Sequence, residues 1–152
     1  MIVYSATKKE FMIHVENDSI ACEIDACYRE KIGKSNYREF KSWENSMQYV
    51  YKALNTQDID DNCAVAIEYR IPSTSKRIDF IISGLDENDK SNVIIIELKQ
   101  WEKIEAVDEE EALVKTFING GDRKTVHPSY QAWTYSALIE DYNENVQEGN
   151  II

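Results

Sequence analysis

Three charged residues interrupt two apolar stretches of the sequence, and their types suit them to chemistry. Asp79 stands within the stretch 78–82, and Glu97 and Lys99 stand within the stretch 96–99. Burying an unpaired carboxylate costs several kcal/mol of folding free energy, so these side chains need partners. Carboxylate oxygens are the ligands that Mg²⁺ prefers, and a bound ion can activate water and neutralise charge on a phosphate. The three residues therefore predict hydrolysis of a phosphodiester, with Lys99 holding or polarising the attacking water.

The stretches that carry these residues have the period of β-strands. Residues 64–71 alternate in polarity, and residues 77–83 and 92–101 are largely apolar, so we expect three consecutive strands. The third is apolar on both faces, which indicates a central strand. A period of two places Glu97 and Lys99 on the same face of this strand.

A simple choice of register brings the acidic side chains together. If the first strand pair closes with residue 71 opposite residue 76, Glu68 faces Asp79. If the next pair closes with residue 83 opposite residue 93, Asp79 faces Glu97. Like charges directly opposite one another destabilise a sheet. Three carboxylates in a row, beside a row of bases, are expected if a cation binds the acids and a phosphate meets the bases; the row of bases is Arg70, Arg77 and Lys99.

Helices are expected before and after these strands. Thr7 and Glu10 have the spacing of a capping box, and Ser35 is expected to cap a longer helix with one apolar face. Residues 112–126 indicate a hairpin that turns at 119–122, and Pro128 suits the first turn of a helix. The final residues, 150–152, resemble the start of an apolar strand, so we expect the chain to be a piece of a longer protein.

Composition indicates one domain in a reducing compartment. The chain has 152 residues and 43% hydrophobic content, which is enough for a single core. We expect one domain, 1–152, with a helical part at 1–56 and a core of sheet and helix at 64–152. No apolar run approaches the roughly 18 residues that span a bilayer. The three cysteines match no CxxC spacing, so we expect a cytoplasmic protein without disulfides.

The net charge of −11 argues against a nucleic-acid partner, because phosphate binding draws on basic surface. The acidic residues are concentrated away from the candidate centre, at 86–89, 108–111 and 140–148. Basic residues stand closer to the candidate centre in the expected topology. The predicted nucleic-acid contacts are Arg70, Lys76, Arg77, Arg123 and Lys124.

These residues resemble a known signature. Asp79 in the segment RIDF, followed by Glu97-Leu98-Lys99, resembles the Asp…(Asp/Glu)-x-Lys signature of the PD-(D/E)xK nuclease superfamily. Gln131 and Tyr135, four residues apart on one helix face, match the Gln-x-x-x-Tyr motif of its RecB-like branch. The resemblance implies an α+β fold with a restriction-endonuclease-like αβββαβ core, in which helices flank a mixed sheet in α/β/α layers. Extra helices would precede this core, and its last strand would be cut short.

The resemblance also implies roles for individual residues. The implied catalytic residues are Asp79, Glu97, Lys99, Gln131 and Tyr135, with Glu44 as the acid on the preceding helix and Glu39 competing for that role. The implied ligands of Mg²⁺ or Mn²⁺ are Asp79, Glu97 and Leu98, with Glu68 as an additional acid.

The chain as a whole resembles the N-terminal nuclease-like domain of bacterial proteins that carry a Schlafen-type helicase ATPase. This resemblance implies a metal-dependent deoxyribonuclease, with DNA as substrate, RNA as a possible one, and a helicase or ATPase domain downstream. An inactive module that binds nucleic acid or docks onto the ATPase is the alternative, and a purely structural ion network is a third reading. Trp101 and Trp133 are expected to be packing anchors rather than platforms for base stacking.

Overall fold

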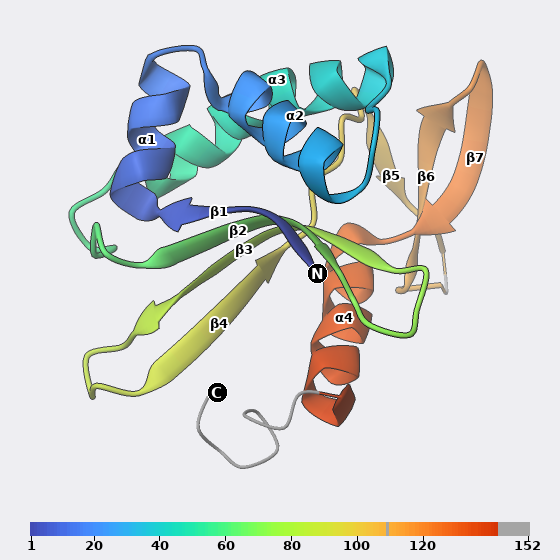
Figure 1. Cartoon of the computed structure of the whole chain (residues 1–152). Helices are drawn as coiled ribbons and strands as arrows, with labels where there is room; N and C mark the ends of the chain where they lie inside the picture. The colour runs from blue at the N-terminus through green and yellow to red at the C-terminus, as the bar shows by residue number, and fades with distance from the viewer. Residues whose placement is uncertain (109, 143–152) are drawn as a thin grey trace.

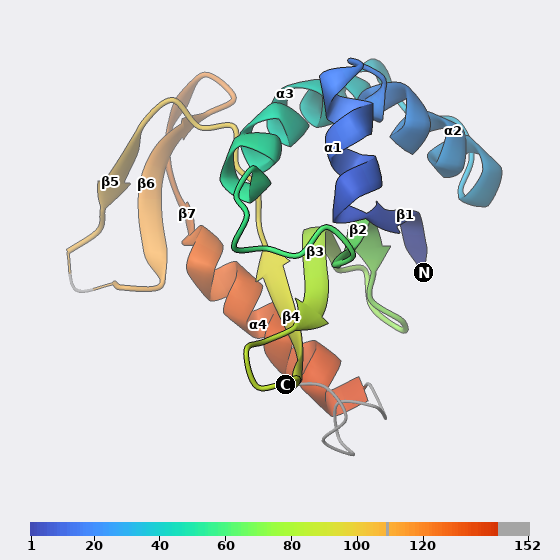
Figure 2. The same cartoon turned by 90° about the vertical axis from the view of Figure 1, so that its left-hand side faces the viewer.

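The described part of the chain, residues 1–108 and 110–142, is an α+β structure with four helices and two antiparallel sheets in this computed structural model. The elements are β1 (Ile2–Thr7), α1 (Lys8–Glu16), α2 (Ile20–Lys31), α3 (Tyr37–Leu54), β2 (Ala64–Arg70), β3 (Arg77–Leu85), β4 (Ser91–Ile96), β5 (Ile104–Ala106), β6 (Leu113–Ile118), β7 (Gly121–Val126) and α4 (Pro128–Tyr142). Helices α1–α3 cover one face of the larger sheet, and α4 lies against the other (Figures 1 and 2).

Two helices begin at capping boxes, which supply partners for N–H groups that the first turn leaves free. The predicted box of Thr7 and Glu10 opens α1, and a second box of Asn36 and Glu39 opens α3. The predicted cap at Ser35 is therefore wrong by one residue. In the described ranges, no helix has the length and apolar character needed to cross a membrane.

The larger sheet has the order β1-β2-β3-β4, and both predicted registers are confirmed. The N–H of Ile71 donates to the carbonyl of Lys76 at 3.1 Å, and Ser83 pairs with Val93. The sheet that was expected to be mixed is antiparallel throughout its described strands. The strand expected to begin at 150–152 lies outside the described residues.

The N-terminal strand β1 is an element that the sequence did not predict. It pairs with β2 across the chain, with Ser5 opposite Ala66, and buries Val3 and Tyr4. Six residues are too short a window for periodicity alone to distinguish strand from coil. The segment becomes a strand because it pairs with distant residues: Ser5 and its partner Ala66 are 61 positions apart.

Two hydrophobic clusters hold the layers together. Phe11 of α1 and Trp43 of α3 belong to the larger cluster, between α1–α3 and the sheet, and Phe11 meets Phe80 of β3 with ring centroids 5.4 Å apart. The smaller cluster, on the opposite face, contains Ile78 of β3 and Tyr135 of α4. This smaller cluster fixes α4, and with it the Gln-x-x-x-Tyr motif, against the sheet.

In β2 and β3, the side chains reverse the face of the sheet on which they lie, and both strands do so at the same level. Ile67 and Phe80 pair with each other and belong to the larger cluster, whereas Tyr69 and Ile78, the next pair, pack in the smaller one. Side chains two positions apart normally share a face, so the expected alternation of residues 64–71 is wrong here. Glu68, between the two pairs, has a left-handed φ of 59°. Such strain in a residue other than glycine concentrates at functional sites.

The second sheet, β5-β6-β7, stands beside the larger one (Figures 1 and 2). The predicted hairpin is confirmed as β6 and β7, and Asn119 and Gly120 at its turn have φ values of 51° and 86°. Two successive positive φ values belong to the type I′ turn, whose twist suits a hairpin. Strand β5 was not predicted.

Candidate functional site

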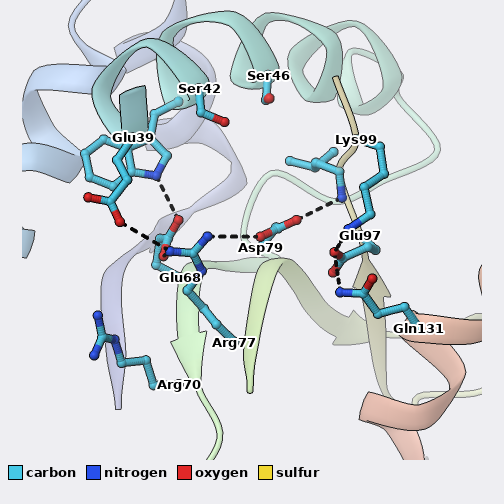
Figure 3. A network of polar contacts seen from close by, with 12 residues as sticks. Glu39, Ser42, Ser46, Glu68, Arg70, Arg77, Asp79, Glu97, Lys99 and Gln131 are labelled. Carbon is cyan, nitrogen blue, oxygen red and sulfur yellow. Dashed lines mark hydrogen bonds and ion pairs between the residues drawn. The ribbon is translucent and has the colours of Figure 1, made fainter. Parts of the chain in front are cut away.

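The five central residues of the predicted motifs line one cleft of about 610 Å³ beneath helix α3. These residues are Asp79, Glu97, Lys99, Gln131 and Tyr135. They come from β3, from the segment after β4 and from α4, so three separate parts of the chain supply the cleft. Figure 3 places Asp79 between the Glu68–Arg77 pair on one side and Glu97 on the other.

The segment that carries Glu97 and Lys99 is not a strand, because β4 ends at Ile96. The predicted strand over 92–101 is therefore too long. Beyond Ile96, the N–H of Leu98 donates to Oδ2 of Asp79 at 3.0 Å. In a strand, this N–H would donate to a main-chain carbonyl of the neighbouring strand; here it donates to the carboxylate of Asp79 instead. This bond holds the segment and orients Asp79 toward the cleft.

Glu97 has one saturated carboxylate oxygen and one unpaired oxygen. Its Oε1 accepts from Nζ of Lys99 and from Nε2 of Gln131, both at 2.6 Å, while the same amide nitrogen donates to the hydroxyl of Tyr135 at 2.7 Å. The side chain is only 5% exposed, and Oε2 is buried with no hydrogen-bond partner among the described residues. Burial raises the pKa of Glu97, the nearby Asp79 raises it further, and Lys99 opposes both. An unpaired buried carboxylate oxygen is costly unless a ligand takes it.

Glu97 is therefore expected to destabilise the protein at neutral pH in the absence of a metal ion. A raised folded-state pKa gives stability that is present below the unfolded pKa, about 4.3 for glutamate, and is lost as pH rises through the folded pKa. Glu97→Gln, which mimics the neutral acid, should have a higher free energy of unfolding than the wild type at about pH 8. The gain should shrink toward about pH 4. Urea unfolding in EDTA measures it.

The matched control for this measurement is Glu87→Gln, at an exposed loop position, which should leave stability unchanged at both pH values. A Glu97→Gln protein less stable than the wild type at the higher pH would contradict the role assigned to burial.

Glu68 is held by a tryptophan and an arginine. Nε1–H of Trp43 donates to its Oε1 at 2.8 Å, and Nη1 of Arg77 lies 2.9 Å from Oε2. The contact at Oε2 is not a hydrogen bond, but at this distance the opposite charges attract strongly at a side chain that is 4% exposed. Burial raises the pKa of Glu68, while Trp43 and Arg77 oppose the shift.

Arg77 lies among acids instead of in a separate row of bases. Besides Glu68, it approaches Oε1 of Glu39 at 3.7 Å and Oδ1 of Asp79 at 3.9 Å. Arg70 points away from the cluster (Figure 3) and donates to the hydroxyl of Tyr28 at 3.2 Å. The predicted row of bases is therefore wrong, because the long guanidinium side chain reaches across to the nearest buried charge.

The remaining predicted residues are divided between the cleft and other places. Lys76 and Glu39 line the cleft, whereas Glu44 lines the neighbouring hollow and pairs with Lys41. The structure thus brings the competing acid Glu39 to the site and not Glu44. The two basic residues of β7, Arg123 and Lys124, do not line the cleft, and Lys124 lies 3.3 Å from Glu110.

The sequence did not single out Trp43, which lines the cleft, or Gln100, which lines the neighbouring hollow. Nε2 of Gln100 donates to Oγ of Ser46 at 2.9 Å and to the carbonyl and hydroxyl oxygens of Ser42 at 3.1 and 3.2 Å. These bonds tie the segment after β4 to α3. The four-residue spacing of Ser42 and Ser46 places both on one helix face, which is the only sequence signal for this contact.

The oxygen atoms of the cleft suit an ion such as Mg²⁺ better than a metal that needs three or more protein ligands. Within 1–108 and 110–142, no group of three or more His, Cys, Asp or Glu side chains is arranged to hold a metal. Mg²⁺, however, is usually bound through one or two carboxylates and keeps several waters. The free Oε2 of Glu97 and the carboxylate of Asp79 provide such a pair. Leu98 can contribute only its carbonyl oxygen, since its N–H is bonded to Asp79.

Comparison of the chain with protein-family models, with curated proteins and with solved structures gave no match.

Proposed function

We propose that the cleft is the active site of a Mg²⁺- or Mn²⁺-dependent nuclease that hydrolyses phosphodiester bonds of DNA. The observation that carries the proposal is the buried Oε2 of Glu97, which has no hydrogen-bond partner among the described residues and shares one cleft with Asp79 and Lys99. A carboxylate this well buried, with one oxygen saturated and the other free, suits an ion as its missing partner.

Each residue of the cleft has a distinct role in this proposal. Asp79 and Glu97 would hold the ion, which would supply an activated water and neutralise charge on the phosphate. The ammonium of Lys99 holds the attacking water or stabilises the negative charge that develops on the phosphate. Gln131 and Tyr135 fix the carboxylate of Glu97 through a chain of two hydrogen bonds. The backbone N–H of Leu98 does the same for Asp79.

We also assign α3, β2, β3, β4 and α4 to the restriction-endonuclease-like core of the PD-(D/E)xK nucleases, with β5–β7 as an insertion between β4 and α4. What supports this is the order of elements together with the layers on both faces of the sheet. The preceding β1, α1 and α2 are additions to that core. A helicase or ATPase domain remains the proposed partner.

A second candidate is a nuclease-like module that binds nucleic acid or an ATPase without cleavage. The favouring observation is that cations of the chain already meet the acids: Lys99 lies 2.6 Å from Glu97, and Arg77 lies 2.9 Å from Glu68. The net charge of −11 also weakens attraction to a polyanion. Cleavage distinguishes the two candidates, because a site whose acids are already neutralised by Lys99 and Arg77 would not cut nucleic acid.

The direct test incubates the protein with single-stranded DNA, double-stranded DNA and RNA in Mn²⁺, Mg²⁺, Ca²⁺ or EDTA. We expect cleavage of DNA in Mn²⁺ or Mg²⁺ and none in EDTA. Binding of DNA or RNA without cleavage in any of the four conditions would favour the second candidate and contradict the first.

Gln131→Ala should lower the cleavage rate by about 10- to 100-fold, the usual effect of removing a group that orients a metal ligand. The reason is that Glu97 loses a 2.6 Å hydrogen bond and Tyr135 loses its donor. Cleavage rates at saturating Mn²⁺ measure the effect. Gln57→Ala, at an exposed position outside the cleft, is the control. Equal rates for Gln131→Ala and the wild type would rule out the positioning role.

A further inference from the structure

A second hollow, of about 660 Å³, lies beside the cleft and has a different chemical character. It shares Ser46, Leu98 and Lys99 with the cleft. Its own walls carry the aromatic rings of Tyr49 from α3 and Trp101 from the segment after β4. A ligand that reaches Lys99 in the cleft can therefore continue into the hollow without leaving the protein surface.

Each aromatic ring of the hollow has a lysine ammonium close to its face. Nζ of Lys52 lies 5.2 Å from the ring centroid of Tyr49, and Nζ of Lys99 lies 5.9 Å from that of Trp101. Tyr49 is 71% exposed, so it contributes little to the core. Trp101 is half-buried. Aromatic rings together with nearby cations are the combination by which proteins hold single-stranded nucleic acids.

We propose that the hollow binds a nucleobase of a single-stranded nucleic acid, stacked on Tyr49 or Trp101, while the adjoining phosphate extends toward Lys99 and the cleft. The role of the hollow as a substrate subsite rests on the proposed nuclease function. Base binding itself requires only the two rings and their lysines.

The magnitudes of the competing contacts favour the base over the lysine. A cation–π contact at an exposed site is worth about 0.5–1 kcal/mol, whereas stacking of a base on an aromatic side chain is worth about 1–3 kcal/mol. A base can therefore displace the ammonium of Lys52 from Tyr49. The displaced ammonium is then free to meet a phosphate of the same strand.

The charges in the hollow do not oppose this ligand as strongly as the overall charge suggests. Glu44 lines the hollow but forms an ion pair with Lys41, which reduces its field on a phosphate. Lys52 provides a positive charge there against the exposed Glu102, while Lys99 is already paired with Glu97. A duplex is a poor ligand, because the faces of its bases are covered by their neighbours. The hollow thus selects single strands.

Fluorescence anisotropy of labelled oligonucleotides in EDTA tests the proposal without any metal or cleavage. The wild type should bind single-stranded DNA or RNA more tightly than duplex DNA of the same length. Tyr49→Ala and Trp101→Ala should each weaken single-strand binding by about 5- to 150-fold, which is the stacking energy expressed as a ratio of dissociation constants. Because Tyr49 is largely exposed, its replacement should leave thermal unfolding unchanged.

Tyr37→Ala is a closely matched control. Tyr37 is on the same helix, is 75% exposed and has Nζ of Lys41 at 6.0 Å from its ring, but it lies outside both the cleft and the hollow. Its replacement should change the dissociation constant by less than about 2-fold, since no base reaches it. An equal loss in Tyr37→Ala and Tyr49→Ala would overturn the proposal, as would equal binding of single and double strands.

The same variants separate this inference from the proposed function. Weaker binding by Tyr49→Ala than by a wild type that cuts nothing supports the hollow and favours the second candidate, which binds without cleavage. Cleavage of single strands at the wild-type rate and affinity by both Tyr49→Ala and Trp101→Ala overturns the hollow and leaves the nuclease intact.

Discussion

Asp79→Asn is expected to reduce metal-dependent cleavage by about 100-fold or more without unfolding the protein. The amide oxygen of asparagine can still accept the N–H of Leu98, which Oδ2 of Asp79 accepts at 3.0 Å in the wild type. The backbone beyond β4 therefore stays in place, while the charge that would hold the cation is lost. Initial cleavage rates in Mn²⁺, together with thermal unfolding of the same samples, separate activity from folding.

Lys99→Ala should reduce the cleavage rate by a similar factor, but by affecting the attack of water and not the binding of the metal. Its ammonium, 2.6 Å from Oε1 of Glu97, is the group assigned to the attacking water or the developing charge, so metal binding should survive in this variant. Asp89→Asn and Lys90→Ala, both at exposed loop positions, are the matched controls and should cleave at the wild-type rate. Full activity of either site variant would refute the assignment of the cleft.

Arg77→Leu is expected to have the largest effect on stability. Breaking one side of a buried ion pair costs about 3–5 kcal/mol, but Arg77 is 38% exposed, and water screens part of the interaction. A loss of about 2 kcal/mol in the free energy of unfolding at neutral pH is the discounted expectation. It arises because the carboxylate of Glu68, 4% exposed, keeps only the indole N–H of Trp43 as a partner within residues 1–108 and 110–142.

The pH dependence identifies Glu68 as the cause. Its folded-state pKa is already raised by burial, and loss of Arg77 raises it further, so protonation at acidic pH removes the unpaired charge. The stability difference between Arg77→Leu and the wild type should therefore narrow as pH falls through that pKa. Adding Glu68→Gln should recover much of the loss at neutral pH. A difference that stays constant with pH and is unaffected by Glu68→Gln would assign the loss to packing instead.

Local chemistry in the sequence was enough to predict much of the frame around the site. The capping box at Thr7, the hairpin turn at Asn119 and both strand registers depend on neighbouring residues or on turn closure, and each is confirmed. These registers also predicted that Asp79 and Glu97 approach each other from β3 and from the end of β4. Both residues line the same cleft.

The features that were missed depend on contacts between distant residues. Periodicity extended β4 through Lys99, because it could not reveal that the side chain of Asp79 accepts the N–H of Leu98. It likewise placed Arg77 beside the acids and not among them, because periodicity could not show that the guanidinium reaches across to Glu68. Trp133, expected to be a packing anchor, is 63% exposed, because the apolar side of α4 that meets the sheet includes Tyr135 instead.

The most direct test of the central claim is calorimetric titration of Mn²⁺ into the wild-type protein and into Asp79→Asn. The free Oε2 of Glu97 and the carboxylate of Asp79 predict one binding event in the wild type and its loss in the variant. Folding of both proteins is verified first by circular dichroism. No binding by the folded wild type, or equal binding by the two proteins, would contradict a metal site in this cleft and the hydrolytic function proposed for it.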